Sequence, residues 1–150
     1  KLLALLSIIQ IVYGAFIAGL KAGRIYNTWP KMGDQWIPES VYAMSPFWAN
    51  FVEGLAGIQF VHRTLAIALL LFTIHIFISC KKFELSLIQK RAMVLLLVIV
   101  IMQMIFGILT LIMKTPIYLS LTHQLLAFIM LMALILNLYL FKSNSSKTYQ

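Results

Sequence analysis

Four long apolar runs limit what this chain can fold into. They cover residues 2–20, 55–80, 92–113 and 116–141, and each is long enough to cross a bilayer of about 30 Å as an α-helix. With 62% hydrophobic and 11% charged residues among 150, the chain has more apolar surface than a soluble domain of this size can bury. We therefore expect an all-α membrane protein, a bundle of four transmembrane helices that contacts membrane lipid.

The distribution of charge predicts how the bundle is oriented. Although the net charge is +8, the basic residues lie mostly at the ends of the apolar runs, where topology explains them and nucleic-acid binding is not needed. Residues 81–91 are strongly basic, whereas residues 21–54 balance bases with acids. The positive-inside rule then places both termini on the cytoplasmic side of a bacterial plasma (inner) membrane, or alternatively in the matrix of a mitochondrion.

This orientation divides the chain into a transmembrane domain, residues 1–142, and a polar tail, residues 143–150. Within the domain, residues 21–54 form the outer loop, which holds all three tryptophans and three of the four prolines. Such a composition favours an ordered loop at the membrane interface over a flexible linker. In this loop, Asn27 and Asp34 could line a ligand entry, although ordinary turn chemistry explains them equally well.

An internal repeat relates the two halves of the transmembrane domain. The first and third apolar runs share a glutamine, a glycine four residues later and a lysine seven residues after that, while the second and fourth runs each carry a histidine. The matching residues are Gln10, Gly14, Lys21 and His62 in the first half, and Gln103, Gly107, Lys114 and His123 in the second. Equal spacings predict two repeated helix pairs related by a pseudo-twofold axis along the membrane normal.

The two repeated histidines are expected at one depth in the membrane. His62 and His123 each follow the start of their apolar run by seven residues, which corresponds to roughly 10 Å below the outer boundary. Two imidazoles at one depth can ligate the opposite faces of a haem iron, and Gly14 and Gly107 would let the porphyrin approach the flanking helices. Alternatively, each histidine only hydrogen-bonds a neighbouring helix. His75 points more than 100° away from His62 and serves as the control.

Three further polar residues surround the first histidine. Arg63 keeps its charge, so burial would demand an anionic partner, either a haem propionate or Glu53; snorkelling toward the headgroups is the alternative. Gln59 precedes Arg63 by one helical turn and could join the same network. Glu53 lies at the mouth of the second run, where it can stabilise the helix dipole or, as a candidate catalytic residue, transfer protons. Because Cys80 is the single cysteine, any haem must be bound noncovalently.

Three segments carry a resemblance to a known family. They are GAFIAGLKAGRIYNTWPKMGDQWIPE at residues 14–39, NFVEGLAGIQFVHR at 50–63 and GILTLIMKTPIYLSLTHQ at 107–124. On these segments the chain resembles the carboxy-terminal half of haem A synthase, in the branch found in mitochondria and alphaproteobacteria. The resemblance implies a membrane oxidoreductase of haem A biosynthesis and cytochrome oxidase assembly, with two homologous halves. It converts the C8 methyl of its substrate, haem O, to a formyl group.

The same resemblance implies roles for individual residues. His62 and His123 match the paired iron ligands of a b-type haem that serves electron transfer in this half, and Glu53 matches a glutamate ahead of the first histidine. Because Lys1 is not an initiator methionine, we expect a processed or partial chain. A first-half chain or a homodimer would then restore the second site, and haem O synthase is a further expected partner.

Three classes of function stay open at this point. The first is haem A synthase activity, with haem O as substrate. The second is a cytochrome b-like membrane subunit that relays electrons without modifying haem. The third is a structural assembly partner whose histidines only hold helices together.

Overall fold

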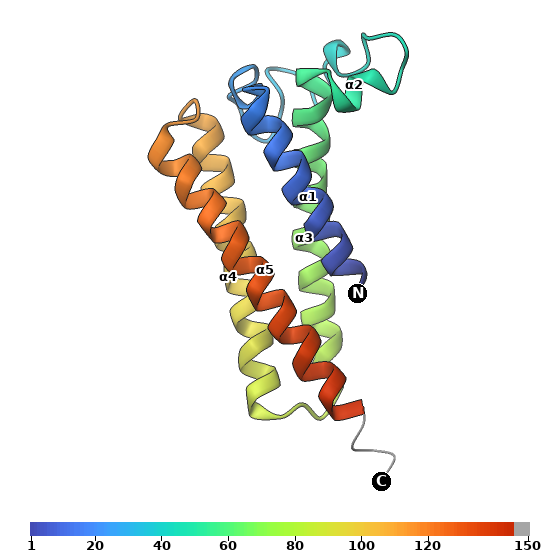
Figure 1. The fold of residues 1–150 in the computed structure, drawn as a ribbon, viewed down its shortest axis with the longest axis vertical. Helices are drawn as coiled ribbons and strands as arrows, with labels where there is room; N and C mark the ends of the chain where they lie inside the picture. Colours follow the sequence, from blue (N-terminus) through green and yellow to red (C-terminus); the bar gives the residue numbers. More distant parts are fainter. Residues whose placement is uncertain (146–150) are drawn as a thin grey trace.

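Four long helices form the body of the protein (Figure 1). The computed structural model describes residues 1–145, and for the last three of these only the backbone. The long helices are α1 (Leu2–Gly19), α3 (Leu55–Cys80), α4 (Leu87–Ile112) and α5 (Ile117–Ser145). All four are long and apolar enough to cross a membrane, and residues 1–145 contain no strand, so the expected all-α membrane fold is confirmed.

The helices pack as the two pairs that the repeat predicts. α1 packs along α3, and α4 packs along α5, with fewer contacts between the pairs (Figure 1). α1 and α4 run toward the outer loop, whereas α3 and α5 run away from it. The repeat extends to the helix ends, because Lys21 and Lys114 both adopt the left-handed conformation just after α1 and α4, with φ of 54° and 60°. The sequence repeat is therefore also a structural one.

Two helix boundaries differ from the sequence expectation. α4 begins at Leu87, five residues before the predicted start, because Ser86 and Gln89 form a capping box that satisfies the first backbone donors. α5 continues to Ser145, so the first residues of the predicted polar tail are helical. The rest of that predicted tail, residues 146–150, lies outside the described residues.

The outer loop is ordered by short helices and its own small core. It contains η1 (Ala22–Arg24), η2 (Glu39–Val41) and α2 (Ala49–Val52). Met32, Val41 and Ala56 form the loop core, which packs the loop onto the top of α3. A larger cluster, the helix core, fills the bundle farther from the loop: Leu3, Leu69, Leu96, Ile99, Val100, Met130, Ala133 and Leu134. The stretch of the bundle between these two cores contains both repeated histidines.

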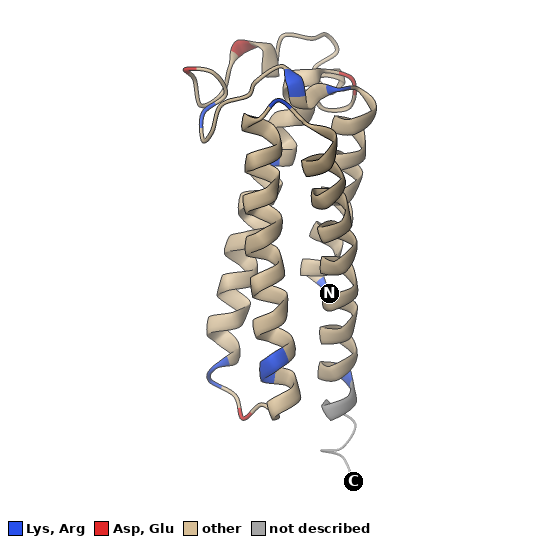
Figure 2. Ribbon diagram, turned by 90° about the vertical axis from the view of Figure 1, so that its left-hand side faces the viewer, with Lys and Arg blue, Asp and Glu red and all other residues tan. Residues whose placement is uncertain are grey.

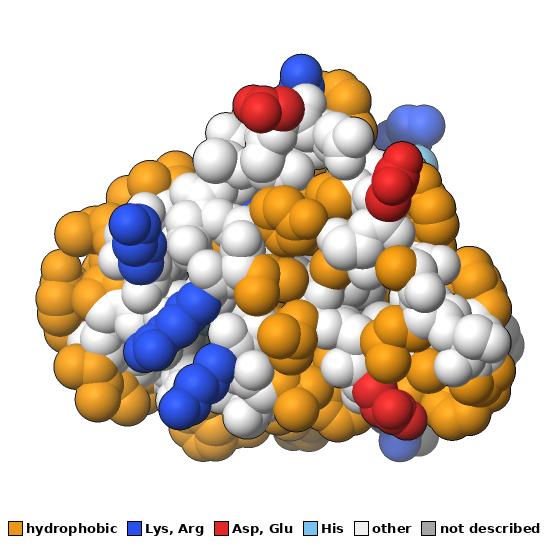
Figure 3. All heavy atoms as spheres, turned by 90° about the horizontal axis from the view of Figure 1, so that it is seen from above, with side chains coloured by type: hydrophobic (Ala, Val, Ile, Leu, Met, Phe, Trp, Pro, Cys, Tyr) orange, Lys and Arg blue, Asp and Glu red, His pale blue; other side chains and the backbone are white. Residues whose placement is uncertain are grey.

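Charged residues concentrate at the two ends of the bundle (Figure 2). The space-filling view from the loop end shows one group of basic side chains on one side of this face, while acidic side chains with further basic ones beside them are spread over the remainder (Figure 3). Many large apolar side chains along the helices are exposed, for example Leu71, Leu121 and Phe128. Exposed apolar helix faces between charged ends are what a lipid bilayer requires of a spanning bundle.

Candidate functional site

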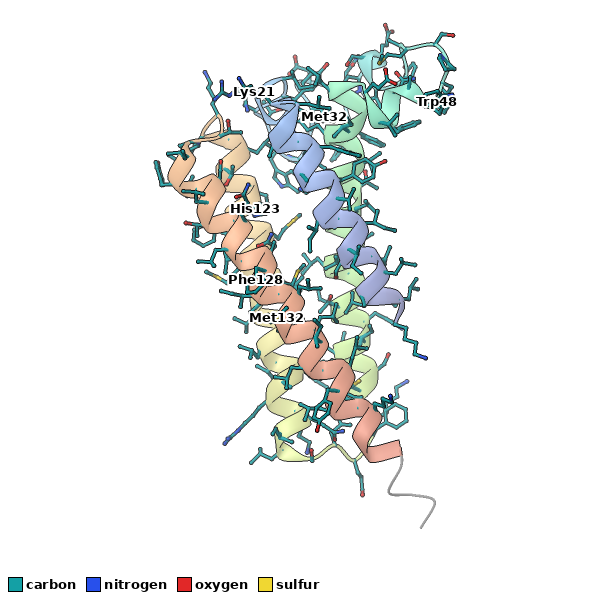
Figure 4. All side chains as sticks on the ribbon, in the orientation of Figure 1. Lys21, Met32, Trp48, His123, Phe128 and Met132 are labelled. Carbon is teal, nitrogen blue, oxygen red and sulfur yellow. The ribbon has the colours of Figure 1, made fainter. Side chains whose placement is uncertain are left out.

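Each repeated histidine contacts the repeated glutamine of its own helix pair. Gln10 Nε2 on α1 lies 3.3 Å from His62 Nε2 on α3, and Gln103 Nε2 on α4 lies 3.4 Å from His123 Nε2 on α5. Figure 4 shows His123 in the half of α5 nearer the outer loop. The repeat thus places two equivalent glutamine and histidine pairs inside the bundle.

The second nitrogen of each imidazole is left free inside the protein. Nδ1 of His62 and Nδ1 of His123 are both buried and have no hydrogen-bond partner. The amide oxygens of Gln10 and Gln103 are likewise buried without a partner. Buried polar atoms without partners are uncommon and costly, so a site that repeats them twice is a candidate for a ligand.

The repeated glycines lie directly against the histidine rings. A Cβ added at Gly14 would be 3.3 Å from His62 Cε1, and one added at Gly107 would be 2.9 Å from His123 Cε1. The missing side chains therefore make room for the imidazoles themselves. The predicted approach of a porphyrin to these glycines is a separate matter and stays a prediction.

The two repeated histidines differ from the control residue, His75, in their burial and contacts. His75 is exposed, whereas His62 and His123 are half-buried and each has a buried Nδ1. Of the three histidines, these two contact a glutamine on the neighbouring helix of their own pair.

Arg63 anchors the outer loop to α3. Its NH1 donates to the carbonyls of Thr28 and Lys31 at 2.9 and 3.2 Å, and its NH2 donates to the carbonyl of Tyr26 at 2.8 Å. The guanidinium carbon lies 5.8 Å from the centre of the Trp29 ring. Arg63 is only 8% exposed, so it does not snorkel to the surface. Carbonyl dipoles and an aromatic face thus surround a charge for which the sequence argument required an anion.

Gln59, one turn before Arg63, shares a loop carbonyl with it as acceptor. Its Nε2 donates to the Tyr26 carbonyl at 3.1 Å, which also accepts from Arg63. Nε of Arg63 is buried with no partner, so its N–H remains available as a donor. This free donor leaves the predicted contact with a haem propionate open, and that contact stays a prediction.

Two other groups of predicted residues lie apart from the histidines. Glu53 is exposed at the end of α2, it is not a hydrogen-bond partner of Arg63, and no side-chain hydrogen bond caps α3 at Gly54. Asn27 donates to the carbonyls of Gly23 and Leu111 at 2.8 and 2.9 Å, which ties the outer loop to α4. Asp34 is exposed. Asn27 therefore has a structural role, and a ligand entry at Asn27 and Asp34 stays a prediction.

The histidine site fits the chemistry of a bis-histidine haem. Each imidazole offers one buried nitrogen without a partner, while its other nitrogen faces a polar group, as ligating histidines require. Among residues 1–145 no cluster of three or more His, Cys, Asp or Glu side chains could hold a metal by itself. Two imidazoles alone suffice for haem because the porphyrin supplies the remaining ligands of the iron.

Fold and site together define a multi-pass helical membrane protein with two half-buried imidazoles whose Nδ1 atoms are buried without a partner. The family model of the cytochrome oxidase assembly proteins, COX15-CtaA, matches residues 1–135. The chain belongs to this family, which confirms the resemblance found in the three sequence segments.

Relatives with known names support the same conclusion. The chain is 45% identical over 126 residues to a protein named heme A synthase from Flavobacterium psychrophilum, covering 83% of this chain and 37% of that protein. It is 43% identical over 134 residues to heme A synthase from Flavobacterium johnsoniae, covering 88% and 39%. The heme A synthase of Bartonella tribocorum is 41% identical over 130 residues, covering 86% and 36%. The chain thus spans less than two fifths of these relatives, and no solved structure matches it.

Sequence reasoning did not include the glutamines in the site. In the sequence, Gln10 and Gln103 serve only as markers of the repeat. The signal that could have identified them was their spacing, since a residue four positions before a glycine lies on the same helix face. A glycine that accommodates a histidine ring therefore places such a glutamine beside that ring.

Proposed function

We propose that this chain is a haem-binding half of a haem A synthase, with His62 and His123 as axial ligands of a noncovalent b-type haem. The observation that carries the proposal is the pair of imidazoles at matching positions of two repeated helix pairs, each with a buried Nδ1 that has no hydrogen-bond partner. Membership of the COX15-CtaA family supports the same assignment.

The chain's own residues would give the haem its environment. His62 and His123 would hold the haem through their imidazoles, and Arg63 would offer its free Nε to a propionate. The apolar walls of the bundle would exclude water from the iron. A bound haem supplies one-electron redox chemistry, and two imidazole ligands leave no open coordination position for a substrate. This half therefore suits electron transfer during the oxidation of haem O better than the oxidation itself.

The first experiment is purification in mild detergent, followed by oxidised and dithionite-reduced visible spectra and a haem-to-protein ratio. We expect a low-spin, six-coordinate b-type spectrum. His62→Ala and His123→Ala should lose most of the haem, whereas His75→Ala, on the exposed face of α3, should retain it. Equal retention in all three variants would contradict the assignment of the ligands.

Oxidation of haem O to haem A is proposed for an assembly that includes this half. Because the chain spans less than two fifths of its relatives, the assembly would add either a first-half segment or a second copy of this chain. This wider proposal includes Glu53 as a candidate catalytic residue and haem O synthase as a partner of the assembly. Haem A formation in a strain that lacks its own haem A synthase tests it, with and without a co-expressed first half.

The alternative function is that of a cytochrome b-like electron carrier. The two proposed histidine ligands favour the carrier function, because a haem with both of these positions occupied can relay electrons without binding a substrate at the iron. A protein that binds haem and undergoes reversible reduction, yet yields no haem A in any of these combinations, would support the carrier over the synthase.

For localisation we propose the bacterial plasma membrane, with the outer loop facing outward and residues 81–86 in the cytoplasm. The test uses Cys80→Ser protein, which lacks cysteine, with a new cysteine at one of two exposed positions. In intact cells a membrane-impermeant maleimide should label Asp34→Cys and should label Lys82→Cys only after permeabilisation. The reverse pattern would invert the topology.

A further inference from the structure

We propose that Gln10 and Gln103 are positioning residues that orient and polarise the two histidine ligands, one glutamine for each imidazole. The inference rests on the haem ligation proposed above and assigns a role to two residues outside that ligand set. It is carried by the two equivalent contacts between glutamine and histidine and by the buried atoms that they leave without partners.

The geometry of the amides shows how each glutamine would act. Nε2 of each amide faces the histidine Nε2, while Oε1 is buried without a donor. A half turn of the terminal amide exchanges these two atoms, so that Oε1 accepts a hydrogen bond from the imidazole N–H. The amide oxygen then gains a donor, and the lone pair of the ring is left on Nδ1, which has no hydrogen-bond partner in the protein.

This hydrogen bond would determine two properties of the ligand. It fixes which ring nitrogen carries the proton, and it holds the ring at one rotation about its side chain. An acceptor on the N–H also increases electron density on the other nitrogen, which makes it a stronger ligand for oxidised iron. The glutamines would therefore set both the orientation of the imidazoles and the reduction potential of the haem.

Simple helix packing does not account for the two amides. An apolar side chain of similar volume would fill the same space without removing a polar amide from water. Moreover, Gln124, next to His123 on α5, is exposed, so glutamine is not confined to the bundle interior in this chain. Gln124 provides the matched control.

The experiment compares purified, haem-loaded wild-type protein with leucine and glutamate variants of Gln10 and Gln103, and with Gln124→Leu. Leucine removes the acceptor and should raise the midpoint potential, whereas glutamate is a stronger acceptor and should lower it. The low-spin electron paramagnetic resonance spectrum should change with the potential, and Gln124→Leu should match wild type in both. Potentials and spectra unchanged in all four site variants, or changed equally in Gln124→Leu, would overturn the inference.

The outcomes separate this inference from the proposal on which it rests. If His62→Ala and His123→Ala keep their haem, the ligand assignment fails first. If they lose it while the glutamine variants behave as wild type, only the positioning role fails.

Loss of haem from the glutamine variants themselves is also decisive. In that case 15N-histidine NMR of the haem-free proteins measures the tautomer directly. One fixed tautomer in wild type and a mixture in the leucine variants would support the inference. The same tautomer in both would overturn it.

Discussion

The space beside the histidine rings predicts unequal effects for two equivalent glycines. Carbon atoms settle about 3.5 to 4.0 Å apart. A methyl group at Gly107, 2.9 Å from His123 Cε1, would therefore displace the ring by about 0.6 Å or more. A methyl group at Gly14, 3.3 Å from His62 Cε1, would displace that ring by only about 0.2 Å. Ligand distances at a metal site tolerate about 0.2 Å, so Gly107→Ala should misplace its ligand while Gly14→Ala remains near the limit.

The energetic cost follows from overpacking. Inserting a methyl into a well-packed interior costs about 1–3 kcal/mol, which corresponds to a roughly 5- to 150-fold weaker binding of haem by Gly107→Ala. The fold itself should survive, because alanine is a better helix former than glycine by up to about 1 kcal/mol. The expected result is an intact helical bundle with a specific loss of haem.

The assay is titration of haem into the haem-free protein in detergent, followed by Soret absorbance, with thermal unfolding recorded in parallel. Gly19→Ala is the matched control, because a Cβ at Gly19 of α1 meets nothing within 4 Å. Haem affinity should decrease in the order Gly19→Ala, Gly14→Ala, Gly107→Ala. Wild-type affinity in Gly107→Ala, or a larger loss in Gly14→Ala, would refute the steric reasoning.

Three further predictions concern the outer loop. Arg63→Met removes three hydrogen bonds to loop carbonyls and leaves the Thr28 carbonyl without a donor, whereas those of Tyr26 and Lys31 still accept from Gln59 and Thr28. The loop should therefore be loosened by about 1–3 kcal/mol and cleaved faster by trypsin, and unchanged cleavage would count against this anchor. In Gly57→Ala the new Cβ would overlap the carbonyl oxygen of Asn50, a backbone atom that cannot rotate away. The melting temperature should therefore fall well below that of Gly19→Ala, whose Cβ meets nothing within 4 Å. Asn27→Ala removes the donor to the carbonyls of Gly23 and Leu111, so the attachment of the loop to α4 should be weakened by about 1–2 kcal/mol. Backbone amides where the loop meets α4 should then exchange hydrogen faster, and exchange at the wild-type rate would contradict this attachment.

Arg63 shows why part of the site could not be predicted from the sequence. The sequence argument correctly identified a buried charge that needs partners, but the structure supplies neutral carbonyls and an aromatic ring. These acceptors lie more than thirty positions away in the chain, on a loop whose path no local pattern specifies. Only the folded loop brings them to α3.

Gln10 and Gly14 show a similar limit on α1. Their spacing predicted a repeat and a shared helix face, yet it could not show that a histidine of another helix occupies that face. The rotation of α1 about its own axis, relative to α3, decides whether the amide meets an imidazole or lipid. That rotation depends on packing over the whole helix pair.

By itself, the sequence determined that four helices cross a membrane, that they form two repeated pairs, and that His62 and His123 occupy matching places. These properties follow from the length of apolar runs and from fixed spacings, which depend on local geometry alone. The tertiary structure decided which atoms surround those histidines: a glutamine amide lies 3.3 or 3.4 Å from Nε2 of each ring, and a glycine packs against the ring. It also left Nδ1 of each ring without a hydrogen-bond partner. The physical reason is that such contacts join different helices, so they depend on how the helices rotate and pack against one another.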